Sequence, residues 1–178
     1  GALVEEAGGR GRLLPIAPDD ADSLRATFAL AEGADLIVTI GGASVGDHDR
    51  VGAVAAELGM DLSFHKIAMR PGKPLMAGRV MGVPMLGLPG NPVSSYVCAH
   101  LFLLPMLRAM TGQPAEPVPL RARLTAPVPA NGPRAHYMRA AVGPDGTLAV
   151  DRRPPRPLRG SAARAALPLG RQVTSRRA

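Results

Sequence analysis

The chain has 178 residues, 46% of them hydrophobic but only 3% aromatic, so it can bury one sizeable aliphatic core with a small second domain beside it. Its single cysteine, Cys98, excludes an internal disulfide framework, suits a reducing cytoplasmic setting and, within an apolar run, is expected to pack rather than react. The net charge of +7 falls within residues 151–178, where eight arginines face one acid, so it indicates a solvated tail and makes nucleic-acid binding unlikely.

The first forty residues predict two helices and two strands. Residues 1–6 are typical of the end of a helix, and the two glutamates there do not fit the apolar part of a secretory signal. Residues 13–16 predict a short strand, and Asp19 or Asp20 is expected to cap a second helix. The continuous apolar run 36–40 is typical of a strand buried on both faces. The apolar stripe of the second helix consists of Leu24, Phe28 and Ala31 and is stopped by Gly33.

From residue 41 to 111 the pattern predicts a loop (41–49), a helix (51–58), two strands (62–69 and 85–88) and a long helix (92–111). Strands that alternate with helices favour an α/β fold with a mostly parallel sheet.

The long helix is predicted to begin at a turn in which Asn91 caps and Pro92 takes the first helical position, and to bend at Pro105. Its most hydrophobic run, residues 96–107, has only a dozen residues. A membrane-spanning helix needs about 20, so the run predicts a buried helix of a soluble protein rather than a membrane segment.

The composition changes at Gly112, which divides the chain into a predicted α/β domain (1–112) and a second domain (113–178). Six prolines between Pro114 and Pro133 separate short β-like segments, typical of a small all-β module, and the Arg/Pro-rich tail diverges from this pattern from about residue 151. The β-like segments are residues 118–124, 136–142 and 147–150.

A glycine-rich loop is the first motif that points to chemistry. Three glycines directly after a predicted buried strand allow backbone N–H groups to approach an anion, and Thr39 and Ser44 add hydroxyl donors. Asp47 and Asp49 are a plausible Mg²⁺ pair, because Mg²⁺ is usually held by one or two carboxylates plus substrate phosphates. A purely structural turn, with Asp49 capping the next helix, is the alternative. The glycines are Gly41, Gly42 and Gly46.

A cationic segment is the second motif. If residues 62–69 form a strand, Lys66 and Arg70 lie on one face, roughly 13 Å apart at the usual rise per residue. Lys73 follows in a rigid Pro-Gly-Lys-Pro sequence. Such a row suits an elongated ligand with several anionic groups; three solvated surface cations are the alternative.

These two motifs, followed by Leu-Pro-Gly-Asn-Pro-Val-Ser at residues 88–94, resemble the molybdopterin molybdenumtransferase family, which includes bacterial MoeA and the C-terminal domain of gephyrin. The resemblance runs from residue 1 to about 112 and more loosely to 140. It implies a MogA-like three-layer α/β domain and a small β-barrel. The opening strand of the α/β domain is expected to be missing, as are the last strands of the barrel.

The resemblance implies an enzyme of molybdenum cofactor biosynthesis that uses Mg²⁺ and molybdate, takes adenylated molybdopterin and releases AMP; the full-length family member is expected to be a homodimer. It implies catalytic roles for Asp49, Lys66 and Arg70, where Arg70 replaces the usual lysine. The metal is assigned to Asp47 and Asp49. Ligand binding is assigned to Asp19, Gly41, Gly42, Ser44, Gly46, Lys73, Pro89, Gly90, Asn91 and Arg139.

Three alternatives stay open at this point. A MogA-like molybdopterin adenylyltransferase or a nucleotide pyrophosphatase would keep the fold and change the reaction. From a different class, the chain could be a catalytically silent binding or dimerisation module. The Pro-Gly-Lys-Pro sequence and the added β module favour the molybdenumtransferase.

Overall fold

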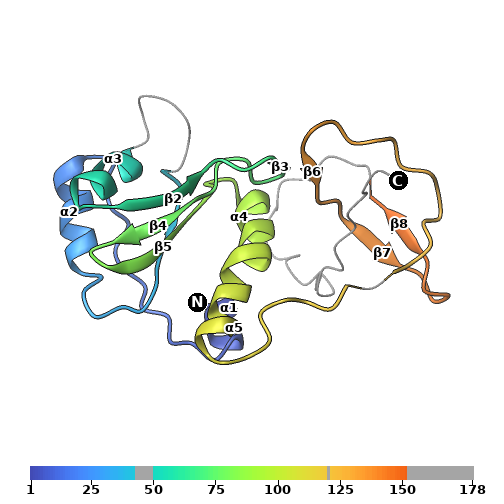
Figure 1. The fold of residues 1–178 in the computed structure, drawn as a ribbon, viewed down its shortest axis with the longest axis horizontal. Coiled ribbons are helices and arrows are strands. Elements are labelled where there is room, and N and C mark those ends of the chain that lie inside the picture. The colour runs from blue at the N-terminus through green and yellow to red at the C-terminus, as the bar shows by residue number, and fades with distance from the viewer. Residues whose placement is uncertain (43–49, 120, 152–178) are drawn as a thin grey trace. The chain divides into compact units, whose positions relative to one another are not determined.

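The computed structural model describes residues 1–42, 50–119 and 121–151, which fall into two compact units (Figure 1). The first unit comprises Gly1–Ile67 and Pro71–Pro117; the second comprises Ala68–Arg70 and the chain from Val118 onward. The domain boundary at Gly112 stays a prediction, and the division by contacts lies a few residues after it.

The first unit is built on a four-stranded sheet in the order β1-β5-β4-β2. β1 (Ile37–Ile40) is parallel to β5 (Val83–Leu88). β4 (Met76–Val80) pairs antiparallel with both β5 and β2 (Asp61–His65). The predicted α/β class is confirmed, and the sheet is mixed, with the parallel pairing confined to β1 and β5.

Strand β4 was not predicted, and a tight turn explains its antiparallel pairing. The two residues between β4 and β5, Met81 and Gly82, both have positive φ, 52° and 78°. Two consecutive positive φ values match the right-handed twist of a two-residue hairpin. The usual Asn-Gly or Asp-Gly signal is absent, because methionine holds the first position.

The helices of the first unit follow the predicted apolar spacing. They are α1 (Ala2–Glu6), α2 (Ala21–Ala29), α3 (Arg50–Glu57), α4 (Pro92–Cys98) and α5 (Leu104–Met110). Both predicted caps are confirmed. Asp20 accepts a hydrogen bond of 2.8 Å from the Ser23 backbone N–H, and Asn91 accepts from two backbone N–H groups of α4.

The helical stretch from Pro92 to Met110 contains a π-helical turn, η1 (Ala99–Leu103), between α4 and α5. This turn ends two residues before Pro105, which lacks an N–H for the regular ladder. The bend at Pro105 stays a prediction. The stretch has 19 residues and a mean hydropathy of 1.3, enough by length and composition alone to cross a membrane, and only 28% of its apolar window is buried. The helical stretch therefore has nearly its predicted bounds of 92–111 but is less buried than predicted; one such helix is weak evidence for a membrane.

The core of the first unit joins α2 and α3 to the sheet. Leu24 and Phe28 of α2 pack with Val54 of α3, and all three are at most 8% exposed. They meet Met85 of β5, which is fully buried, so the sheet and both helices are held by one aliphatic cluster. Other buried members are Ala31, Ile37, Val51, Ala55, Met76 and Val80.

Three predicted strands differ from the structure. Residues 13–16 form no strand, and Leu13 and Ile16 are 88% and 96% exposed. The run 36–40 is not buried on both faces, because only Ile37 of β1 is buried and Ile40 is 70% exposed. The strand predicted over 62–69 ends at His65, since Lys66 has a φ of 68° that no strand accommodates.

The second unit contains two short strand pairs. β3 (Met69–Arg70) is parallel to β6 (Ala135–His136), and β7 (Ala140–Val142) is antiparallel to β8 (Leu148–Val150). Of the strand predicted over 118–124, the described part shows one isolated bridge, between Leu124 and Leu148. The Arg-rich tail lies outside the described residues.

Candidate functional site

The glycine segment after β1 and the Pro-Gly-Asn turn after β5 meet at one edge of the sheet. Because β1 and β5 are parallel, their carboxyl ends point the same way, and such edges are where α/β sheets bind ligands. The Gly41 N–H donates to the Leu88 carbonyl at 3.0 Å. A cavity of about 320 Å³ opens there, lined by Gly41, Gly42, Pro74, Pro89, Gly90, Asn91 and Ser94.

Two glycines in the wall of this cavity cannot be replaced without strain. Gly41 and Gly42 have φ values of 88° and 69°, in the left-handed region. A Cβ on Gly42 would overlap Cγ2 of Val51, in the first turn of α3. A Cβ on Gly90 would stand 3.4 Å from the Gly41 Cα, so the two loops approach each other backbone to backbone. The predicted need for glycine is met at these positions.

The start of α4 forms another wall. The Asn91 side-chain oxygen accepts from the backbone N–H groups of Val93 and Ser94 at 3.0 and 3.2 Å. Asn91 therefore orients the helix as well as lining the cavity. A helix N-terminus carries partial positive charge and favours anions, and the lining side chains are themselves uncharged.

The cationic segment reaches the cavity through a loop rather than along a strand. The Lys66 N–H donates to the Leu75 carbonyl at 2.9 Å, and the Ile67 N–H donates to the Lys73 carbonyl at 3.1 Å. These bonds turn the chain back on itself, and Pro74, the residue after Lys73, lines the cavity. The predicted single row of Lys66 and Arg70 on one strand face is wrong, because the strand is broken at Lys66.

Lys66 is one of two non-glycine residues with positive φ in the described part of the chain. Lysine is uncommon in this conformation, and such strain clusters at functional sites. The side chains of Lys66 and Lys73 are both exposed.

Cys98 lies next to the Pro-Gly-Lys-Pro loop. Its thiol is fully buried and lies 3.9 Å from the Gly72 carbonyl oxygen, to which it donates. Burial raises the pKa of Cys98 to about 11, so the thiol stays protonated at neutral pH. The prediction that Cys98 packs is confirmed.

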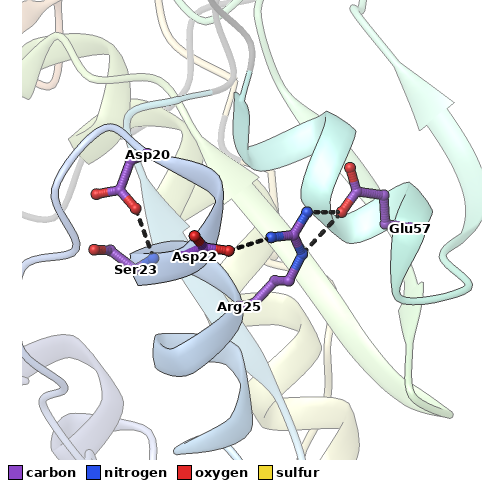
Figure 2. A network of polar contacts seen from close by, with 5 residues as sticks. All are labelled: Asp20, Asp22, Ser23, Arg25 and Glu57. Atoms are coloured by element: carbon purple, nitrogen blue, oxygen red, sulfur yellow. Dashed lines mark hydrogen bonds and ion pairs between the residues drawn. The ribbon is translucent and has the colours of Figure 1, made fainter.

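Asp19 lies at the start of α2 and faces α3. Its Oδ1 is 3.6 Å from Nε of Arg50, the first residue of α3. Elsewhere on the same two helices, Arg25 donates to Glu57 at 2.6 and 3.0 Å and also bonds Asp22 (Figure 2).

Two of the predicted cations belong to the second unit. Arg70 is exposed on β3, and Arg139 forms an ion pair of 3.6 Å with Asp151, whose N–H donates to the Arg139 carbonyl. The ligand role of Arg139 stays a prediction. Burial first, and Arg70 second, lower the pKa of His136, the register partner of Arg70.

The structure thus brings Gly41, Gly42, Pro89, Gly90 and Asn91 to one cavity. Sequence reasoning did not assign Pro74 and Ser94 to the site, although both belong to quoted motifs. The remaining predicted residues, Ser44, Gly46, Asp47 and Asp49, lie outside the described residues. Within the described ranges no cluster of three or more His, Cys, Asp or Glu side chains could hold a metal.

Comparisons with known proteins identify the family. Residues 1–109 match the family model described as a probable molybdopterin binding domain. A molybdopterin molybdenumtransferase of Nostoc is 35% identical over 77% of this chain, and molybdopterin molybdenumtransferase 2 of Mycobacterium tuberculosis is 36% identical over 86%. The chain spans 33% and 40% of the length of these relatives.

A solved structure is similar as well. The molybdopterin biosynthesis MoeA protein of Pyrococcus horikosii superposes with a TM-score of 0.70 at 29% identity, over 85% of this chain and 37% of that one.

Proposed function

The chain belongs to the molybdopterin-binding family that includes the molybdopterin molybdenumtransferases, and from this membership we propose that it acts in the insertion of molybdenum into molybdopterin. The cavity where the glycine segment, the Pro-Gly-Lys-Pro loop and the Pro-Gly-Asn turn meet carries this proposal. Adenylated molybdopterin and molybdate are the proposed substrates, and AMP the proposed product. A cytoplasmic location is proposed with them, from the single buried thiol.

The proposed chemistry is electrostatic. Cleavage of a phosphoanhydride develops negative charge on phosphate oxygens, which preorganised donors stabilise in place. The start of α4 supplies the partial positive charge of its helix dipole, and Lys66 and Lys73 supply full charges from the adjoining loop. Arg70 and Arg139 are proposed further cations.

Asp47 and Asp49 are the residues proposed to hold Mg²⁺. When bound, it would neutralise phosphate oxygens. Carboxylate oxygens are suitable ligands for this ion.

Incubating the protein with adenylated molybdopterin, molybdate and Mg²⁺ tests the proposal. We expect AMP release together with molybdenum cofactor. A Lys73→Gln variant should lose most of the rate, whereas Arg79→Gln, an exposed cation on β4 outside the cavity lining, should keep it.

The other outcomes separate the alternatives. Pyrophosphate release from ATP and molybdopterin would instead favour an adenylyltransferase. Cleavage of adenylated molybdopterin without molybdenum insertion would favour a nucleotide pyrophosphatase. Tight binding without any turnover would favour a silent binding module. The homodimer expected for the full-length family member is measured separately, by light scattering.

A further inference from the structure

Arg50 stands at a position that local physics disfavours. It is the first residue of α3, where the helix dipole presents partial positive charge, so a cation there is unfavourable. Asp19 compensates, with its Oδ1 3.6 Å from the Arg50 Nε. Hydrogen bonds from Ser23 lower the pKa of the neighbouring Asp20, and Arg50 lowers it slightly further.

The first turn of α3 packs against a residue of the cavity wall. Val51, the residue after Arg50, is 9% exposed and packs so closely on Gly42 that a Cβ on Gly42 would overlap its side chain. Gly42 in turn lines the cavity. A continuous contact path therefore leads from Asp19 through Arg50 and Val51 to the cavity.

A second ion pair connects the same helices without touching this path. Arg25 of α2 donates to Glu57, the last residue of α3, at 2.6 and 3.0 Å (Figure 2). The Asp19–Arg50 contact is longer, at 3.6 Å. Helix α3 is thus joined to α2 at both of its ends, and only the Asp19–Arg50 end adjoins the cavity wall.

We propose that Asp19 and Arg50 form a positioning pair, which holds the first turn of α3 against Gly42 and so sets the shape of the cavity. Asp19 then acts through Arg50 and does not contact the ligand itself. This proposal deepens the proposed function and rests on it. It also assigns a role to Arg50, to which the sequence motifs assign none.

Three variants test the pair: Asp19→Asn, Arg50→Gln and the double variant. Each single variant should weaken the binding of adenylated molybdopterin, measured by calorimetry, about threefold to fivefold, the scale of an exposed ion pair. The double variant should be no weaker than either single one, because both changes break the same contact. The reversed pair, Asp19→Arg with Arg50→Asp, should recover most of the affinity.

Arg25→Gln is the matched control, since it breaks the other link between α2 and α3. It should lower the thermal midpoint at least as much as Arg50→Gln and leave the affinity unchanged. Wild-type affinity in both Asp19→Asn and Arg50→Gln would overturn the proposal. A reversed pair that stays as weak as Arg50→Gln would also overturn it, by showing that the Arg50 charge itself serves the ligand.

Hydrogen exchange of the Gly41, Gly42 and Val51 amides gives a readout that needs no ligand. Arg50→Gln should accelerate exchange there severalfold, and Arg25→Gln should not. If the wild type binds no adenylated molybdopterin, the proposed function fails. The positioning pair is still tested by the exchange rates of these amides. Unchanged exchange in Arg50→Gln would sink it.

Discussion

The two units of the molecule differ in what fixes their functional residues. The first has a four-stranded sheet with helices packed on a shared aliphatic cluster, and its cavity is walled mainly by backbone. The second has two short strand pairs, and its buried large side chains among the described residues are Met69 and Leu148. A packed core can hold the loop backbone in place, whereas Arg70 lies on a two-residue strand and Arg139 is held by an ion pair with Asp151. The difference teaches that the two units hold their own predicted ligand residues in different ways, the first through a packed core and the second through local contacts.

The largest test of this contrast removes one buried side chain from each unit. Met85→Ala deletes a fully buried side chain of the aliphatic cluster and should lower the free energy of unfolding by about 2–5 kcal/mol. Leu148→Ala, in the second unit, should cost less, because fewer side chains surround it. Hydrogen exchange under denaturant, resolved by segment, should show that each variant loses amide protection in its own unit. If Leu148→Ala reduced the protection of the strands of the first unit as much as Met85→Ala does, the contrast between the units would be wrong.

The next test addresses the backbone wall. Gly42→Ala combines left-handed φ with overlap on Val51, so it should abolish ligand binding and destabilise the protein by about 1–3 kcal/mol. Gly82→Ala is the control. It has a φ of 78° but nothing within 4 Å of an added Cβ, so it should show the strain alone and keep binding. Equal affinities of the two variants, measured by calorimetry, would mean that contact with α3 does not shape the cavity.

A smaller effect is expected at the start of α4. Asn91→Ala removes the cap of two N–H groups and should cost about 1 kcal/mol in unfolding by denaturant. Asn91→Asp keeps an acceptor at the same place and should retain the stability. An Ala variant as stable as the wild type would show that the Pro-Gly-Asn turn, rather than the cap, fixes this wall of the cavity.

The confirmed predictions rest on local signals. The caps at Asp20 and Asn91 follow from side-chain oxygens placed two or three residues before free N–H groups. The meeting of Gly41 with Gly90 was not itself predicted, although it follows from the parallel pairing of β1 and β5, because any two parallel neighbours end at the same edge of a sheet. Such rules need only the sequence and the sheet direction.

The wrong predictions depended on neighbours that periodicity does not reveal. The strand drawn through Lys66 failed because its N–H bonds Leu75 across a loop, and the antiparallel return through Met81 lacked the usual turn residues. The exposure of Ile40 depends on which strands flank β1, a property of the assembled sheet. Asp19 and Arg50 are 31 positions apart in the sequence, and no residue spacing predicts their contact.

The smallest expected effect lies in the second unit and concerns pH. Burial first, and Arg70 second, lower the pKa of His136 below its ordinary 6.5, so the neutral imidazole is favoured when folded. The unfolded chain therefore binds the proton more readily, and this contribution to stability is present above pH 6.5 and is lost as pH falls through the folded pKa. Arg70→Gln should raise the pKa of His136 toward 6.5 without reaching it, because burial remains. An NMR titration of the imidazole measures this shift, with Arg79→Gln of the first unit as the control that should leave it unchanged. A pKa of His136 that does not move in Arg70→Gln would show that the β3–β6 pair is too loose to hold the two side chains together.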